Sequence, residues 1–132
     1  MSRRYPTADT PYPQDRLARL IRRLEALGVA VKADDEGERL ATALGAEALY
    51  IPEAGRPGVL VLAARPSCAA VLEELIHIGQ HRREGWGDVT EVIPWMELEA
   101  QTRMIDRSLR WDWPMSDIER FERVWDAWRG RI

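Results

Sequence analysis

The stretch SCAAVLEELIHIGQHRR, residues 67–83, decides how this chain is organised. Ser67 is a preferred N-cap residue and Gly85 is a strong terminator, so the sequence predicts a single helix that ends at about residue 83. Apolar side chains cover most of the circumference of this helix, which indicates burial on more than one side. Each polar side chain within it therefore needs a partner, because burying an unpaired polar group costs about 1 to 3 kcal/mol.

Glutamates and histidines recur at one-turn spacing within this helix. Glu73, His77 and His81 are four residues apart and share one face, and the two histidines are the only ones in the chain. Glu74 stands one position round from Glu73. The order E-E-x-x-H is one substitution away from the zinc-metalloprotease signature H-E-x-x-H, with Glu73 where the first histidine would be. This face is a candidate set of metal ligands.

The segments before the helix have the composition of strands. Residues 29–32, 48–51 and 59–62 are β-type apolar runs, and a loop containing proline and glycine joins the last two. Residues 34–38 are an acidic run that we expect to form a solvated turn, followed by a short helix at residues 40–44. The sequence therefore predicts a small three-stranded sheet that packs on the long helix.

Two further helices are expected after the long helix. Pro94 opens one that runs from Trp95 to about Leu109. Ser116 followed by Glu119 has the spacing of a capping box and predicts the start of the last helix.

The length and composition are those of one globular domain. The chain has 132 residues, of which 45% are hydrophobic and 31% charged, and this is enough for a single core. Residues 1–13 contain three prolines and are expected to be an irregular lead-in. Residues 14–132 are then expected to form one α+β domain that begins with a helix at about residues 14–27.

Charge and hydropathy argue against two classes of partner. A formal net charge of −3 gives no general attraction for nucleic acid or for an anionic membrane. No apolar run approaches the roughly 20 residues that a membrane helix needs, and the first residues lack the apolar segment of a signal peptide. We therefore expect a cytoplasmic protein, or a domain that belongs to a larger secreted protein.

The sequence resembles the zincin-like metallopeptidase domains found as C-terminal toxin modules of bacterial polymorphic toxin systems. The resemblance rests on Glu-Glu-Leu-Ile-His-x-x-Gln-His-Arg at residues 73–82 and on the pair Glu99-Ala100, and it covers about residues 47–109. It implies a minimal zincin-like fold, with a small three-stranded sheet packed on an active-site helix that two further helices follow. It also implies a peptide or protein substrate and a cognate immunity protein as partners.

The resemblance further implies a role for each site residue. Glu73, His77 and Glu99 would be the metal ligands, and Glu74 would be the base that deprotonates a metal-activated water. Glu97 is the alternative third ligand, since it lies 20 residues beyond His77 and Glu99 lies 22 beyond it. The implied metal is Zn²⁺, although a set with two carboxylates also suits Mn²⁺ or Fe²⁺.

Two residues outside this ligand set bear on the metal. His81 has two interpretations: a ligand in place of Glu73, or a surface histidine near the helix end, where positive charge favours the dipole. Cys68 is the single cysteine, so thiolate coordination by a pair of cysteines is excluded.

Three functions from different classes remain open. The first is a metal-dependent peptidase-like domain that hydrolyses a peptide bond. The second is a catalytically inactive zincin-like interaction module with a polar Glu/His cluster and no metal. The third treats Glu74-Leu75-Ile76-His77 as one E-x-x-H half of a di-iron bundle, but the second half is missing because the chain has no third histidine.

Overall fold

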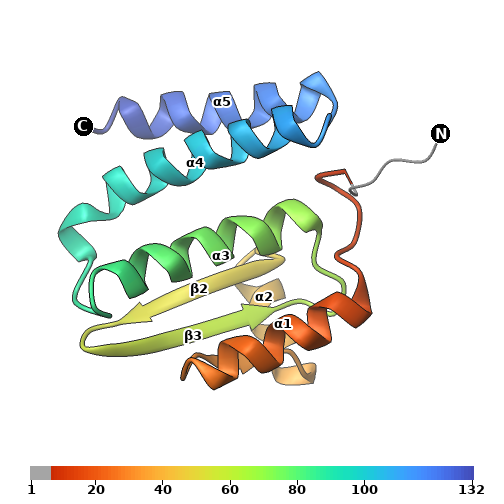
Figure 1. The fold of residues 1–132 in the computed structure, drawn as a ribbon, viewed down its shortest axis with the longest axis vertical. Helices are drawn as coiled ribbons and strands as arrows, with labels where there is room; N and C mark the ends of the chain where they lie inside the picture. The colour runs from red at the N-terminus through yellow and green to blue at the C-terminus, as the bar shows by residue number, and fades with distance from the viewer. Residues whose placement is uncertain (1–6) are drawn as a thin grey trace.

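A computed structural model of the chain describes residues 7–132, which form an α+β fold of five α-helices and a three-stranded mixed sheet. In chain order the elements are α1 (Gln14–Ala26), β1 (Ala30–Lys32), α2 (Asp35–Ala43), β2 (Ala48–Glu53), β3 (Arg56–Leu62), α3 (Cys68–Arg83), the 3-10 helix η1 (Thr90–Val92), α4 (Ile93–Arg110) and α5 (Met115–Arg129) (Figure 1). The three predicted strands and the predicted helices at residues 14–27, 67–83 and 95–109 are confirmed, with shifts of a few residues at their ends.

The sheet has the order β1-β3-β2, so β2 is an edge strand. β1 runs parallel to β3, and β2 pairs with β3 as an antiparallel hairpin in which Tyr50 lies opposite Leu60. The register shifts between Ile51 and Glu53, close to the hairpin turn. An edge strand has one side without a β partner, and here that side lies beside the polar residues of α3.

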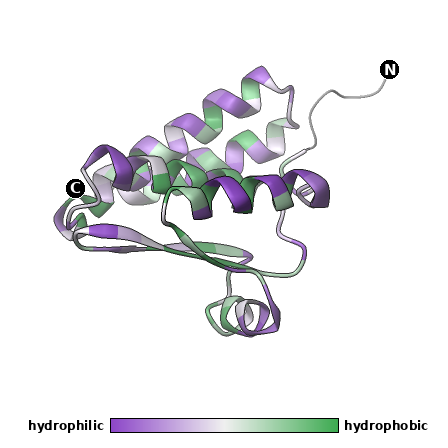
Figure 2. Cartoon of the chain, turned by 60° about the horizontal axis from the view of Figure 1, so that its bottom comes forward, coloured by the Kyte–Doolittle hydropathy of each residue, from purple (hydrophilic) through white to green (hydrophobic). Residues whose placement is uncertain are grey.

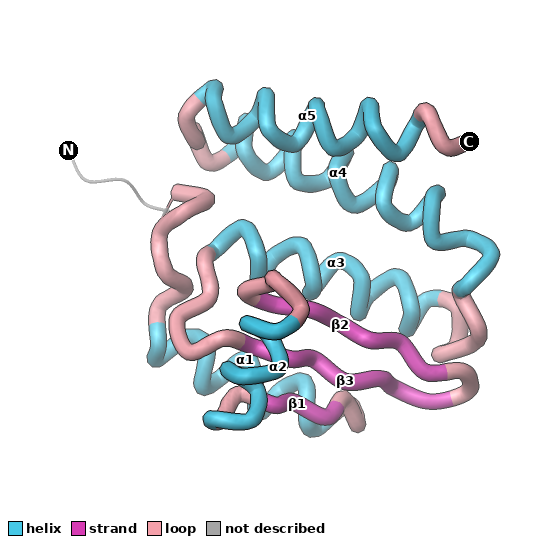
Figure 3. The backbone as a smooth tube through the Cα atoms, turned by 180° about the vertical axis from the view of Figure 1, so that it is seen from behind, coloured by secondary structure: helices cyan, strands magenta, loops and turns pink. Residues whose placement is uncertain are grey.

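The helices cover both faces of the sheet. α1 and α2 lie on opposite sides of it, as the front and back views show (Figures 1 and 3). α3 lies between the sheet and α4, and α5 forms the outermost layer beside α4 (Figure 1). The outer helices alternate between hydrophilic and hydrophobic residues along their length (Figure 2). α3 has the sheet on one side and α4 on the other, which agrees with its nearly all-round apolar composition.

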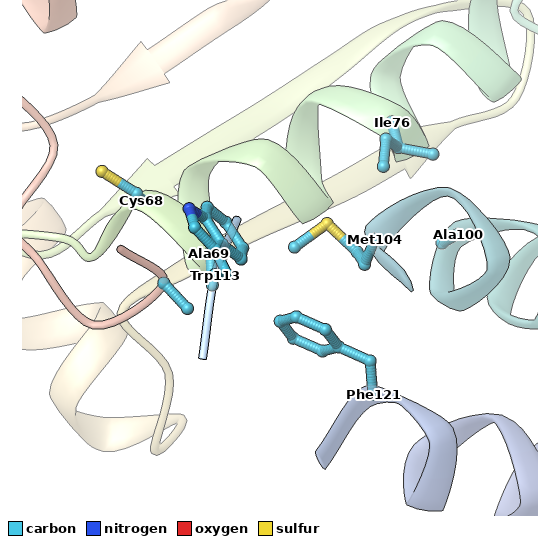
Figure 4. Packing of buried hydrophobic residues seen from close by; sticks show 8 residues of the cluster. Cys68, Ala69, Ile76, Ala100, Met104, Trp113 and Phe121 are labelled. Atoms are coloured by element: carbon cyan, nitrogen blue, oxygen red, sulfur yellow. The ribbon is translucent and has the colours of Figure 1, made fainter. Parts of the chain in front are cut away.

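Two hydrophobic clusters hold these layers together. One joins α1, the sheet and α3, and its buried members are Leu17, Leu24, Val29, Ala48, Tyr50, Leu60, Leu62 and Ile78. The other joins α3, α4 and α5, and its buried members are Ala8, Cys68, Ala69, Ile76, Ala100, Met104, Trp113 and Phe121 (Figure 4). Met104 is completely buried, and truncation of such a side chain typically costs about 2 to 5 kcal/mol. Both clusters include residues of α3, so this helix is fixed from two sides.

Local capping explains where α3 begins. Ser67 is its N-cap, as expected, and the Ser67 side chain accepts a hydrogen bond from the backbone N–H of Ala70. The last turn contains His81, Arg82 and Arg83. The helix is therefore placed by its own cap as well as by tertiary packing.

Two local predictions are wrong. The acidic run is not a solvated turn, because Asp34 is the N-cap of α2 and accepts a hydrogen bond from the N–H of Gly37, so the acidic residues form the first turns of the helix. Negative charge is favourable at a helix N-terminus, which explains the difference. The last helix begins at Met115 after Pro114, with no side-chain cap, so the proposed capping box at Ser116 does not form.

The expected lead-in falls partly outside the described residues. Of residues 1–13, the first six are not described, and residues 7–13 contain no helix. This segment is nevertheless packed against the fold, because Ala8 is fully buried and Pro11 forms an isolated β-bridge with Ser67. Among residues 7–132, no helix combines the length and the apolar character needed to cross a membrane.

Candidate metal centre

Side chains from two helices converge beside the edge strand. Glu73 and His77 come from α3 and Glu97 comes from α4, and each offers one ligand atom within 4.8 Å of the others. The His77 Nε2 atom lies 3.4 Å from Glu97 Oε1. Among the residues that the structure describes, this group could hold a metal ion.

The group lines a cavity of about 220 Å³ between β2, α3 and α4. Its polar wall is formed by Glu73, Glu74, His77 and Glu97, and its other lining residues are Leu49, Tyr50, Pro52, Val89, Ile93 and Met96. The cavity thus combines convergent charged groups with a mainly apolar wall, as ligand sites commonly do.

Burial perturbs the ionisation of the site residues. Burial raises the pKa of Glu73, and it raises the pKa of Glu74 to about 7. For His77, burial disfavours the charged form, but the ion pair with Glu97 and the charge of Glu74 outweigh this effect and raise the pKa to about 9. Perturbed ionisable groups that share a cavity are typical of functional sites.

Glu74, the expected base, is anchored by the edge strand. Its Oε1 atom accepts a hydrogen bond of 2.6 Å from the backbone N–H of Tyr50 in β2. The carboxylate lines the same cavity as Glu73 and His77. One oxygen is therefore held by the strand, and a carboxylate has a second oxygen with which to exchange a proton.

Glu99, the third ligand that the resemblance implies, lies outside the converging group. Its carboxylate accepts hydrogen bonds from Gln80 at 2.7 Å and from Arg83 at 2.9 Å. The hydrogen bond with Arg83 keeps the pKa of Glu99 below its usual range. The structure brings the alternative residue, Glu97, to His77 instead.

His81 is not the surface histidine that its place near the helix end predicts, because its side chain is completely buried. Its Nδ1 lies 2.6 Å from the Tyr50 hydroxyl and its Nε2 lies 3.1 Å from the Gly87 carbonyl oxygen. Both ring nitrogens therefore have protein partners, and His81 is outside the converging group.

Two partners of the site were missed by reasoning from sequence. Gln101 of α4 donates a hydrogen bond of 2.6 Å to Glu73, and Tyr50 holds Glu74. A signal for α4 was present, because Glu97, Gln101 and Met104 recur at the spacing of one helix face. Met104 is completely buried, and Glu97 lies two helical turns before it on the same face, whereas Glu99 does not.

The donor set fits a divalent cation. Ligand atoms at about 2.0 to 2.2 Å from a tetrahedral metal lie about 3.3 to 3.6 Å from one another, close to the 3.4 Å between His77 and Glu97. Two carboxylates and one imidazole form a harder set than the usual two-histidine zinc site. Zn²⁺, Mn²⁺ and Fe²⁺ are all compatible with these donors.

Comparisons with protein-family models, with curated proteins and with solved structures gave no match. The assignment of a function therefore depends on the chemistry of the site itself.

Proposed function

We propose that this chain is a zincin-like, metal-dependent peptidase domain in which Glu73, His77 and Glu97 hold a divalent cation, most simply Zn²⁺. The convergence of these three side chains within 4.8 Å is the observation that carries the proposal. It is supported by the position of Glu74 in the wall of the same cavity. The order Glu73-Glu74-x-x-His77 then supplies two ligands and a base from a single helix turn.

Glu74 is the proposed general base. A bound cation would polarise a water molecule and make it easier to deprotonate. The carboxylate of Glu74 has a pKa of about 7, close to the value at which a group accepts and returns a proton most effectively near neutral pH. The N–H of Tyr50 holds one oxygen in place, so the proton is taken by the other oxygen.

The proposed substrate is a polypeptide. β2 is the edge strand of the sheet and contributes Leu49, Tyr50 and Pro52 to the cavity, so an extended peptide could align beside it. The likeness of the 73–82 motif to toxin modules supports a protein target and a cognate immunity protein, with secretion as part of a larger toxin.

Metal content and one substitution test this proposal. Protein purified without chelator should contain about one equivalent of zinc, manganese or iron by elemental analysis. Glu74→Gln should retain the metal and lower the rate of peptide cleavage by at least about 100-fold, since a general base typically contributes this much. Glu84→Gln, at an exposed position just after the same helix, is the matched control and should cleave at the wild-type rate. Equal cleavage rates for the two variants would remove Glu74 from the mechanism.

A second candidate is a zincin-like interaction module that lacks metal and activity. It is favoured by the hydrogen bonds that the cluster makes on its own: His77 pairs with Glu97, Gln101 donates to Glu73, and Tyr50 donates to Glu74. In this case elemental analysis finds no metal, and Glu97→Gln destabilises the fold by removing the partner of a buried His77 charge. Stoichiometric metal would exclude this candidate.

A further inference from the structure

Two fully buried glutamines flank the candidate ligands. Gln80 of α3 is 2% exposed and Gln101 of α4 is 1% exposed. A buried primary amide costs free energy unless it is hydrogen-bonded, and a leucine or methionine of similar volume would carry no such cost. The partners of these two amides therefore indicate why the positions are polar.

The amide of Gln80 fixes the orientation of the His77 ring and keeps a hydrogen on its Nδ1 atom. Its Nε2 donates to the Met96 carbonyl oxygen at 2.9 Å and to Glu99 Oε1 at 2.7 Å. Both hydrogens of the amide are thus used, so its Oε1 must be the atom that lies 2.8 Å from His77 Nδ1. An amide oxygen only accepts, so Nδ1 donates the hydrogen and Nε2 faces Glu97.

Glu99 anchors this arrangement from the surface. Its Oε1 atom accepts from both Gln80 and Arg83, and its Oε2 lies 3.8 Å from Arg103. The Glu99 side chain is about one-third exposed, whereas Gln80 is buried beneath it. Hydrogen bonds therefore run from Arg83 through Glu99 and Gln80 to His77.

Gln101 acts on the other ligand of α3. Its Nε2 donates to Glu73 Oε1 at 2.6 Å. Its own Oε1 is buried and has no hydrogen-bond partner among the described residues. The amide is therefore only partly satisfied, and its donor to Glu73 is the interaction that accounts for a polar residue here. One oxygen of Glu73 is held, and the other is left for a cation.

We propose that Gln80 and Gln101 are positioning residues of the metal site. Gln80 keeps the Nδ1 hydrogen of His77 in place, so Nε2 is the nitrogen that binds a cation once its proton is displaced, and Gln101 holds one oxygen of Glu73. Glu99 acts through Gln80 and does not bind the metal. The inference rests on the proposed metal site, and it matches the general observation that partners of metal ligands orient them and contribute 10- to 100-fold in affinity.

Zinc titration by calorimetry tests the roles of the two glutamines. Gln80→Met and Gln101→Met keep the side-chain volume and remove the hydrogen bonds, and each should weaken zinc binding by about 10- to 100-fold. Gln14→Met, at an exposed position of α1, is the matched control and should bind zinc as the wild type does. Wild-type affinity in both buried variants overturns the inference and leaves the proposed metal site standing. Failure of the wild type to bind zinc overturns both.

Two glutamate variants distinguish Glu97, a proposed metal ligand, from Glu99, which only holds Gln80 in place. Glu97→Gln removes a ligand and should weaken zinc binding by several hundredfold, at about 3 to 4 kcal/mol per ligand. Glu99→Gln, on a partly exposed side chain that the core does not need, should weaken it by no more than about tenfold. Equal losses for the two variants would make Glu99 a ligand and overturn its assigned role.

A readout without metal tests the hydrogen bond itself. In zinc-free protein the Nδ1–H proton of His77 should exchange slowly with water and give a resolved NMR signal, because the buried Gln80 side chain accepts it. The signal should persist in Gln101→Met and disappear in Gln80→Met. Its persistence in Gln80→Met, with the fold intact by circular dichroism, would overturn the role of Gln80.

Discussion

The two histidines of this chain lie one turn apart on α3, and both are largely buried, but their surroundings differ. His81 has a protein partner at each ring nitrogen: the Gly87 carbonyl oxygen at Nε2 and the Tyr50 hydroxyl at Nδ1. His77 has Gln80 at Nδ1, while its Nε2 faces a carboxylate across a cavity. A histidine binds metal through a ring nitrogen, and of the two only His77 directs one, Nε2, at carboxylates in a cavity, where a cation can displace its proton.

The same comparison defines a structural role for His81. A carbonyl oxygen only accepts, so His81 Nε2 donates to Gly87 and Nδ1 accepts the hydrogen of the Tyr50 hydroxyl. That hydroxyl also accepts a hydrogen bond of 2.9 Å from the Gly58 N–H. The Trp86 ring packs edge-on against the imidazole at 5.2 Å between centroids. His81 thus connects α3 to the β2-β3 hairpin and to the loop that follows the helix.

Removal of each histidine should separate metal affinity from stability. His77→Ala should weaken zinc binding by several hundredfold, because a zinc site loses about 3 to 4 kcal/mol per ligand. His81→Gln keeps one donor and one acceptor and should leave zinc affinity within about threefold of wild type, since His81 is outside the ligand group. Calorimetric titration measures both variants. Comparable losses of zinc affinity in the two variants would make His81 a metal ligand and contradict the distinction between the two histidines.

The opposite ranking is expected for stability. His81→Leu should lower the free energy of unfolding by about 3 kcal/mol, because the hydrogen of the Tyr50 hydroxyl and the Gly87 carbonyl oxygen lose their partner. Urea denaturation of metal-free protein at one fixed pH measures the change. A loss below about 1 kcal/mol would mean that water replaces the imidazole, so that His81 is not a structural residue.

The sequence predicted the order of the elements because each of them has a strong local signal. The apolar periodicity of the helices and the β-type runs at residues 48–51 and 59–62 were sufficient, and Ser67 was enough to place the start of α3. The acidic run at residues 34–38 was predicted to be a turn and is instead the start of α2. The prediction was wrong because an acidic composition suits both an exposed turn and a helix N-terminus. The backbone of Gly37 packs so closely against the Lys32 carbonyl oxygen that a Cβ atom would clash with it. This tertiary contact cannot be predicted from composition.

Only the site residues that lie on a single helix could be predicted from the sequence. Glu73, Glu74 and His77 share a face by covalent spacing, so the sequence was sufficient to group them. The partner from α4 depends on how two helices rotate against each other, and the pair Glu99-Ala100 favoured the residue that turns towards Arg83. The burial of His81 depends on Tyr50, which is distant in sequence, and on Gly87, which lies beyond the end of the helix. The helical pattern around His81 therefore could not predict it.

The pH dependence of stability should show the raised pKa values of Glu74 and His77 in the candidate site. Folding raises the pKa of Glu74 to about 7 and that of His77 to about 9, so the folded protein binds more protons than the unfolded chain. This stabilisation is complete at low pH and is lost as the pH rises through these two values. Metal-free protein should therefore lose about 3 kcal/mol of unfolding free energy between about pH 6 and about pH 8.

Zinc should reverse this trend, because metal binding requires deprotonated ligands. The shift in melting temperature on adding zinc should grow over the same pH range, and His77→Ala should abolish the growth. Thermal unfolding with and without zinc measures both effects. A metal-free protein whose stability rises from about pH 6 to about pH 8 would contradict the assigned protonation of the cluster.

Tyr50 takes part in both regions and provides the smallest and most selective test. Its backbone N–H holds Glu74 in the candidate site, and its hydroxyl holds His81 in the structural network. Tyr50→Phe removes only the hydroxyl, but the Gly58 N–H and His81 Nδ1 lose their partner, so it should lower the free energy of unfolding by about 2 kcal/mol. Zinc affinity and the Glu74-dependent rate should stay within about twofold of wild type, because the backbone donor remains. A tenfold loss of either would show that the two regions are coupled through the side chain as well as through the strand, and His81 would then influence the metal site from a distance.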